Sequence, residues 1–171
     1  MNNKVREAIT IIEKEKERLY SACYKSELTD NEINELLELV AFGYSTVLNQ
    51  DYKLNLYQIK SSREYTYKAI HDFINKKLKE KGKNKDFIDN VANMKTTTAF
   101  YIIKLYQCLE FLDMYKEITE NDEVYIFDNG KYDNCILFVD NCSGIYHCYA
   151  PNEIIFDYKI DEDKLSKIKN K

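Results

Sequence analysis

The sequence predicts an α+β fold, with an N-terminal bundle of about five helices at 1–118 followed by a C-terminal four-stranded antiparallel β-meander at 119–171. Apolar residues recur at helical spacing up to about residue 118, and short alternating runs separated by turn residues follow. A chain of 171 residues is long enough to hold its core without a disulfide or a structural metal. We expect the two parts to pack together as one unit.

The first two helices are expected to form an antiparallel hairpin. The first covers about 4–24, and the second begins with a capping box in which Thr29 caps the helix and Glu32 closes the box. The run IIEKEKERLYSACYKSELTDNEINELLELV resembles the helical hairpin of small sporulation-type aspartyl-phosphate phosphatases. That family's S-Q-E-L-D signature is absent where LLELV stands, so the resemblance implies a hairpin and carries over no catalytic residue.

Three further helices are expected before residue 118. Ser61 and Glu64 form a second capping box, and this helix ends in a lysine-rich turn before Gly82, where a left-handed C-cap is typical. A shorter helix covers about 86–94. The last, AFYIIKLYQCLEFLDMYK, is apolar almost all round, which predicts a central core helix.

The strand region begins after TENDE. Asn129-Gly130 in VYIFDNGKYD predicts a two-residue type I′ hairpin turn. CILFVD and GIYHCYA then flank a second turn, NCSG, and IIFDYKI at 154–160 is the fourth expected strand. We expect one face of this sheet to pack on the helices, and an unpaired edge strand would permit a homodimer by strand addition.

The segment CSGIYHCY raises the question of a metal site or a cysteine nucleophile, because Cys142, His147 and Cys148 lie close together, with Cys135 upstream. Successive side chains on a strand point to opposite faces, so His147 and Cys148 are not expected to meet at one ion or in one dyad. The cysteine spacings also differ from the paired C-x2-C pattern of zinc sites. We therefore predict no metal, no cofactor and no catalytic residue, with a cysteine enzyme as a minor alternative.

Charge is distributed unevenly along a chain whose net charge is −4. An acidic molecule offers no general electrostatic footprint for nucleic acid. One alternative is a helix-turn-helix-like DNA-binding transcriptional regulator using 86–107, although Phe100 to Ile103 stand where a groove reader needs polar side chains. Another is phosphate contact through the lysines of 76–85, which are Lys76, Lys77, Lys79, Lys81, Lys83 and Lys85.

Two further sets of side chains are candidates for contact with a partner protein. Carboxylates gather in EFLDMYKEITENDE, and several of the fifteen tyrosines lie near the expected sheet. Tyrosine is favoured at protein interfaces because one end of it is apolar and the other polar. The acidic set is Glu110, Asp113, Glu117, Glu120, Asp122 and Glu123, and the aromatic set is Tyr125, Tyr132, Tyr146, Tyr149 and Tyr158.

These features predict a non-catalytic protein-binding inhibitor that blocks a surface of its target, a protein or a nucleoprotein complex. Heavy use of Lys, Asn, Ile and Tyr points to a low-GC phage or other mobile element, and so to an anti-defence or anti-CRISPR type. A toxin or bacteriocin immunity protein fits the same features. We expect a cytoplasmic location, because no signal peptide or membrane span is recognised and the five cysteines are an odd number.

Overall fold

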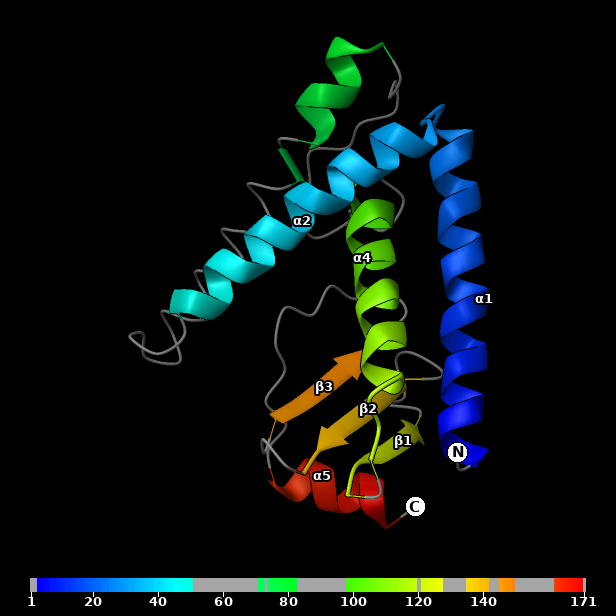
Figure 1. The fold of residues 1–171 in the computed structure, drawn as a ribbon, viewed down its shortest axis with the longest axis vertical. Coiled ribbons are helices and arrows are strands. Elements are labelled where there is room, and N and C mark those ends of the chain that lie inside the picture. Colours follow the sequence, from blue (N-terminus) through cyan, green and yellow to red (C-terminus); the bar gives the residue numbers. More distant parts are fainter. Residues whose placement is uncertain are drawn as a thin grey trace. The chain divides into compact units, whose positions relative to one another are not determined.

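The protein has an α+β fold, as predicted, and the residues that the structure describes form helices and an antiparallel sheet of three strands (Figure 1). This computed structural model describes residues 3–50, 71–72, 74–82, 98–119, 121–127, 135–141, 145–149 and 162–170. The predicted helix at 86–94, the capping box at 61–64, the Asn-Gly turn and the fourth strand at 154–160 lie outside those ranges.

The chain divides into two compact units, one made of 1–16 with 107–171 and the other of 17–106. The predicted boundary at residue 118 therefore falls inside the first unit. The reason is that Phe111 and Tyr115, near the end of a helix, pack against the sheet and belong with it.

The first two helices lie where the sequence predicts them. Helix α1 runs from Asn3 to Lys25 and helix α2 from Asp30 to Gln50. The capping box forms at α2: the Glu32 amide donates to Thr29 Oγ1 at 3.2 Å, and the Thr29 amide donates to Glu32 Oε1 at 3.1 Å. These bonds satisfy two backbone amides that the first helical turn leaves without intrahelical partners.

A helical segment at 74–80 ends as predicted. Gly82 has a φ of 68°, which is the left-handed conformation that glycine adopts most easily, and its amide donates to the Lys79 carbonyl at 3.0 Å. On the inner face of this segment Ile74 and Leu78 are buried. Its lysines are exposed near the end of the helix, where the macrodipole favours cations.

Helix α4 runs from Thr98 to Tyr115 and is the core helix that the sequence predicts. Its buried apolar residues cover several directions around the axis. Two polar side chains are buried together with them, because Lys104 is 0% exposed and Gln107 is 6% exposed. The buried apolar side chains are Ala99, Phe100, Ile102, Ile103, Leu105, Cys108, Phe111 and Tyr115.

The sheet has the order β1-β2-β3, with β1 at Glu123–Phe127, β2 at Cys135–Asp140 and β3 at Ile145–Tyr149. Phe127 pairs with Cys135, whereas a two-residue Asn129-Gly130 turn would pair Phe127 with Tyr132. The predicted register of this hairpin is therefore wrong by three residues. An odd shift exchanges the two faces of a strand, so β2 presents to each side of the sheet the residues that a two-residue turn would have placed on the other side.

Both faces of the sheet are covered within the first unit, whereas the sequence predicted cover on one face. On one face Phe138 packs against Tyr115 of α4. On the other face Leu137 belongs to an apolar cluster that Ile168 packs against. Ile168 lies on α5, an eight-residue helix at Glu162–Lys169 that replaces the expected C-terminal tail (Figure 1).

Candidate binding surfaces

The segment around His147 is a strand, and its side chains alternate as predicted. The His147 ring lies 5.9 Å from the Phe138 ring on the face that packs on α4, whereas Cys148 joins Leu137 and Val139 on the opposite face. His147 and Cys148 therefore do not form a dyad. Within the described ranges no three His, Cys, Asp or Glu side chains gather as metal ligands, and Cys142 lies outside those ranges.

The four cysteines that the structure describes, Cys23, Cys108, Cys135 and Cys148, are buried, and none of them is in a disulfide. Burial raises the pKa of the Cys23 thiol to about 12. A thiol of that pKa stays protonated at neutral pH and is a poor nucleophile, because the thiolate is the reactive form.

The expected tyrosine surface is not assembled by the residues that can be placed. Tyr149 is 1% exposed and belongs to the core, so its assignment to a contact surface is wrong. Tyr125 is half-buried, and its hydroxyl donates to Glu123 Oε2 at 2.6 Å. Tyr132, Tyr158 and the Tyr146 side chain lie outside the described part of the chain.

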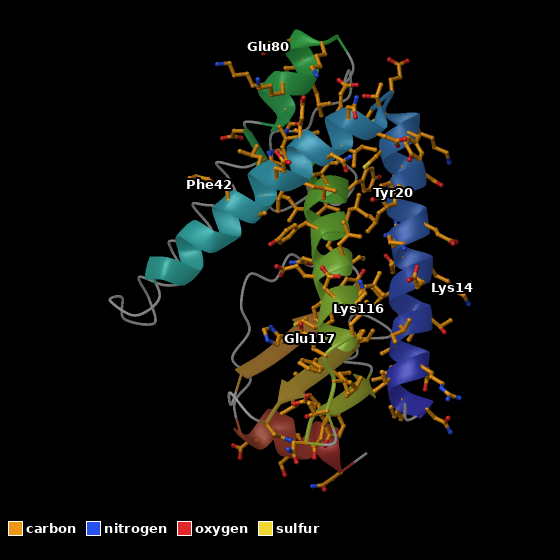
Figure 2. The ribbon with its side chains drawn as sticks, in the orientation of Figure 1. Lys14, Tyr20, Phe42, Glu80, Lys116 and Glu117 are labelled. Carbon is orange, nitrogen blue, oxygen red and sulfur yellow. The ribbon has the colours of Figure 1, made fainter. Side chains whose placement is uncertain are left out.

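Three of the predicted acidic residues form an exposed row at the C-terminal end of α4. Glu110 and Asp113 are three positions apart, which places them along one side of the last helical turns, and Glu117 follows in the turn just beyond Tyr115. Lys116 Nζ lies 3.1 Å from Asp113 Oδ1, with both side chains more than three-quarters exposed (Figure 2). The last turn of α4 contains no basic residue. We call Glu110, Asp113 and Glu117 the acidic row.

The remaining predicted carboxylates have structural partners or lie outside the described residues. Asp122 Oδ2 accepts hydrogen bonds from the Thr119 amide at 2.9 Å and from the Thr119 hydroxyl at 3.2 Å. Glu123 accepts the Tyr125 hydroxyl. Glu120 lies outside the described ranges. Asp122 and Glu123 therefore shape the turn into β1, and the acidic row carries the exposed negative charge of this segment.

The lysine run does not assemble a uniform phosphate-binding surface. Lys76 and Lys79 are exposed, but Lys81 Nζ lies 2.8 Å from Glu32 Oε2, so a carboxylate neutralises part of the run. Lys77 and Lys81 also line a groove that contains three glutamates. Lys83 and Lys85 lie outside the described residues.

The DNA-reading alternative uses 86–107, of which the structure describes 98–107. In that part Tyr101 and Tyr106 are half-buried, and Phe100, Ile102 and Ile103 are almost completely buried. A recognition helix needs an exposed polar face to enter the major groove. The described part of this segment presents no such face.

Sequence reasoning missed a groove in the unit 17–106, between α2 and the helical segment 74–81. Its volume is about 380 Å³. Leucines form its floor, and charged residues of opposite sign occupy its two walls. The lining residues are Leu28, Glu32, Glu35, Leu36, Glu38, Leu39, Lys77, Leu78 and Lys81. We call this the α2 groove.

A signal for the α2 groove exists in the sequence. The buried stripe of α2 includes Ile33, Leu36 and Val40, and Leu39 and Phe42 lie away from that stripe on a face that also carries Glu35 and Glu38. Phe42 is 71% exposed (Figure 2). Apolar residues grouped with carboxylates on an outer helix face are the sequence signal for this groove.

The charge in the α2 groove is partly compensated. The hydrogen bond to Glu32 raises the pKa of the Lys81 ammonium, partial burial opposes this shift, and the charges of Glu32 and Glu35 add to it. Lys81 therefore remains a cation held by the acidic wall. The wall formed by α2 contributes three carboxylates, and the opposite wall contributes two ammonium groups.

Comparisons with protein-family models, with curated proteins and with solved structures found no significant match. Among the described residues, no helix is long and apolar enough to cross a membrane.

Proposed function

We propose that this protein is a non-catalytic inhibitor that binds a target protein and blocks part of its surface. The observation that supports the proposal best is the acidic row at the end of α4. The C-terminus of a helix carries a partial negative charge, so carboxylates near it cost about 0.3–1 kcal/mol each. Carboxylates that stand against this charge preference and remain exposed are candidates for a role in binding.

The expected target presents a basic surface. Complementary charge accelerates encounter and excludes wrong partners. Basic surfaces are typical of proteins that bind nucleic acid, so an inhibitor of this kind competes with the nucleic acid for the same face. An anti-defence or anti-CRISPR protein of a phage or mobile element would act in this way, and an immunity protein that covers a basic toxin would use the same chemistry.

The experiment is affinity capture of the tagged full chain from a low-GC bacterial lysate, with and without nuclease, with captured proteins identified by mass spectrometry and captured nucleic acid by gel electrophoresis. A variant with E110K, D113K and E117K reverses the acidic row. A matched control with E7K, E17K and E80K changes the same net charge at exposed positions elsewhere. A protein retained by the wild type and by the control, but lost by the row variant, supports the proposal.

Two results would contradict the proposal. Recovery of nucleic acid alone, abolished by nuclease or by salt, favours a nucleic-acid-binding role. Equal loss of the captured protein in both triple variants assigns the effect to net charge rather than to the acidic row.

A further inference from the structure

We propose that the α2 groove binds an amphipathic helix of a partner protein, with apolar side chains of that helix on the leucine floor and basic ones beside Glu35 and Glu38. The groove consists of residues from α2 and from the segment 74–81, and none of them belongs to the acidic row. The inference therefore goes beyond the function proposed above and stands or fails separately.

The walls of the groove decide that the occupant is a helix. Both walls are helical, so their backbone amides and carbonyls are bonded within their own helices and only side chains face the groove. A peptide that adds as a β-strand needs a sheet edge, and the residues that line the groove include none from a strand. A helix satisfies its own backbone and packs its side chains between the ridges of two others.

The floor sets the apolar face of the occupant. Leu36 and Leu78 are almost fully buried, Leu39 is half-buried, and the exposed Phe42 lies one turn beyond Leu39 on α2. The distance along α2 from Leu36 to Phe42 is about 9 Å, at a rise of about 1.5 Å per residue. Side chains at i, i+3 or i+4 and i+7 of a docked helix cover such a length.

The acidic wall sets the charge of the occupant. Lys81 is already held by Glu32 at 2.8 Å, whereas Glu35 and Glu38 are exposed along the same wall. The groove as a whole contains one more carboxylate than ammonium groups, because its lining has three glutamates and two lysines. A docked helix whose apolar stripe is flanked by basic residues therefore complements the charge of the groove.

The test uses two synthetic amphipathic peptides of about 18 residues, long enough to form a helix when bound. Both carry the same leucine and phenylalanine stripe, flanked by lysines in one peptide and by glutamates in the other. Binding of each fluorescein-labelled peptide to the full chain is measured by fluorescence anisotropy. We expect the lysine-flanked peptide to bind about tenfold more tightly, as a few exposed charge pairs permit.

Charge reversal of the groove gives the decisive comparison. E35K with E38K is expected to exchange the preference, so that the glutamate-flanked peptide binds more tightly. A misfolded variant would lose both peptides and could not exchange them. E80K is the control, because Glu80 is an exposed residue of the segment 74–81 that does not line the groove (Figure 2). It should leave the preference unchanged.

Three results would overturn the inference. The first is equal affinity for the two peptides, and the second is an unchanged preference in the E35K and E38K variant. The third is a concentration-dependent dimer, measured by sedimentation velocity, that Leu39→Asp converts to a monomer, because a second copy of the chain would then occupy the groove.

Discussion

The Tyr149 hydroxyl in β3 donates a hydrogen bond to Glu15 Oε2 in α1 at an oxygen-to-oxygen distance of 3.3 Å. The Tyr149 hydroxyl oxygen also accepts a hydrogen bond from the Cys108 thiol at 3.7 Å. The Phe111 ring packs edge-on against the Tyr149 ring, with 5.8 Å between the ring centroids. Burial is the main cause that raises the pKa of the Tyr149 hydroxyl far above its ordinary value. The residue is therefore a neutral structural link inside the unit made of 1–16 and 107–171.

Tyr149→Phe tests this link. The ring and its packing remain, so the loss is that of a buried hydrogen bond between a hydroxyl and a carboxylate, and we expect the free energy of unfolding to fall by about 1–2 kcal/mol. Tyr125→Phe is the control, because it removes a hydroxyl bonded to Glu123 at a half-buried site and should cost less. Urea denaturation measures both. Equal effects would contradict the structural role of Tyr149.

A second prediction concerns alkaline pH. The folded chain holds the pKa of Cys23 and of Tyr125 at about 12, in each case chiefly through burial, whereas free thiols and phenols ionise at about 8.5 and 10. The unfolded state therefore loses these protons first, so stability is complete below about pH 8.5 and falls as pH rises towards 12. Urea midpoints measured across this range should decrease. In Cys23→Ala the decrease should be shallower, and an unchanged slope would contradict the assignment.

The capping box at the start of α2 gives a third prediction. Thr29→Ala removes the hydroxyl that accepts the Glu32 amide, and such a loss costs about 0.5–2 kcal/mol of unfolding free energy. Thr29→Ser keeps the hydroxyl and should cost much less. Thermal unfolding of the two variants, followed by circular dichroism, makes the comparison. If serine and alanine lowered the melting temperature equally, the hydroxyl would have no capping role.

The sequence predicted the elements that have strong local signals. The Thr29 and Glu32 capping box, the Gly82 C-cap and the apolar α4 depend on residues close to one another in the chain, and each lies where it was expected. Three of the predicted strands also lie where they were expected. Local signals suffice when backbone geometry and side-chain burial are decided within one or two turns.

The missed features depend on residues far apart in the chain. Lys81 meets Glu32 across 49 positions, and no periodicity places those two residues at one groove. The Asn129-Gly130 signal predicted a register three residues from the observed one, because a local turn preference carries no information on how β1 and β2 pack against the rest of their unit. Helix α5 has only eight residues. So short a segment does not show a helical repeat of apolar residues clearly enough to distinguish it from an irregular tail.

Helix α5 supplies the fourth prediction. Ile168 packs against the cluster of Leu137, Val139 and Cys148, so Ile168→Ala should lower the free energy of unfolding by about 1–2 kcal/mol, a fraction of the cost at a fully buried site. Lys167→Ala, at an exposed neighbouring position, should change it by less than about 0.5 kcal/mol. Denaturant unfolding distinguishes the two. If Ile168→Ala left the free energy of unfolding unchanged, the packing of α5 on this face of the sheet would contribute little to stability.

The last prediction separates folding from binding at the acidic row. In the variant E110Q, D113N and E117Q, the macrodipole penalty and the repulsion between carboxylates disappear, and the exposed Asp113–Lys116 pair that is lost contributes little. We expect the melting temperature to stay the same or rise, while capture of the target is lost. Asp30→Asn is the opposing control, because Asp30 lies at the positive end of α2 and accepts the Tyr24 hydroxyl at 2.6 Å, so its neutralisation should destabilise the protein. Destabilisation of more than about 1 kcal/mol by the triple change would mean that the acidic row is needed for folding, and the argument that it is retained for binding would fail.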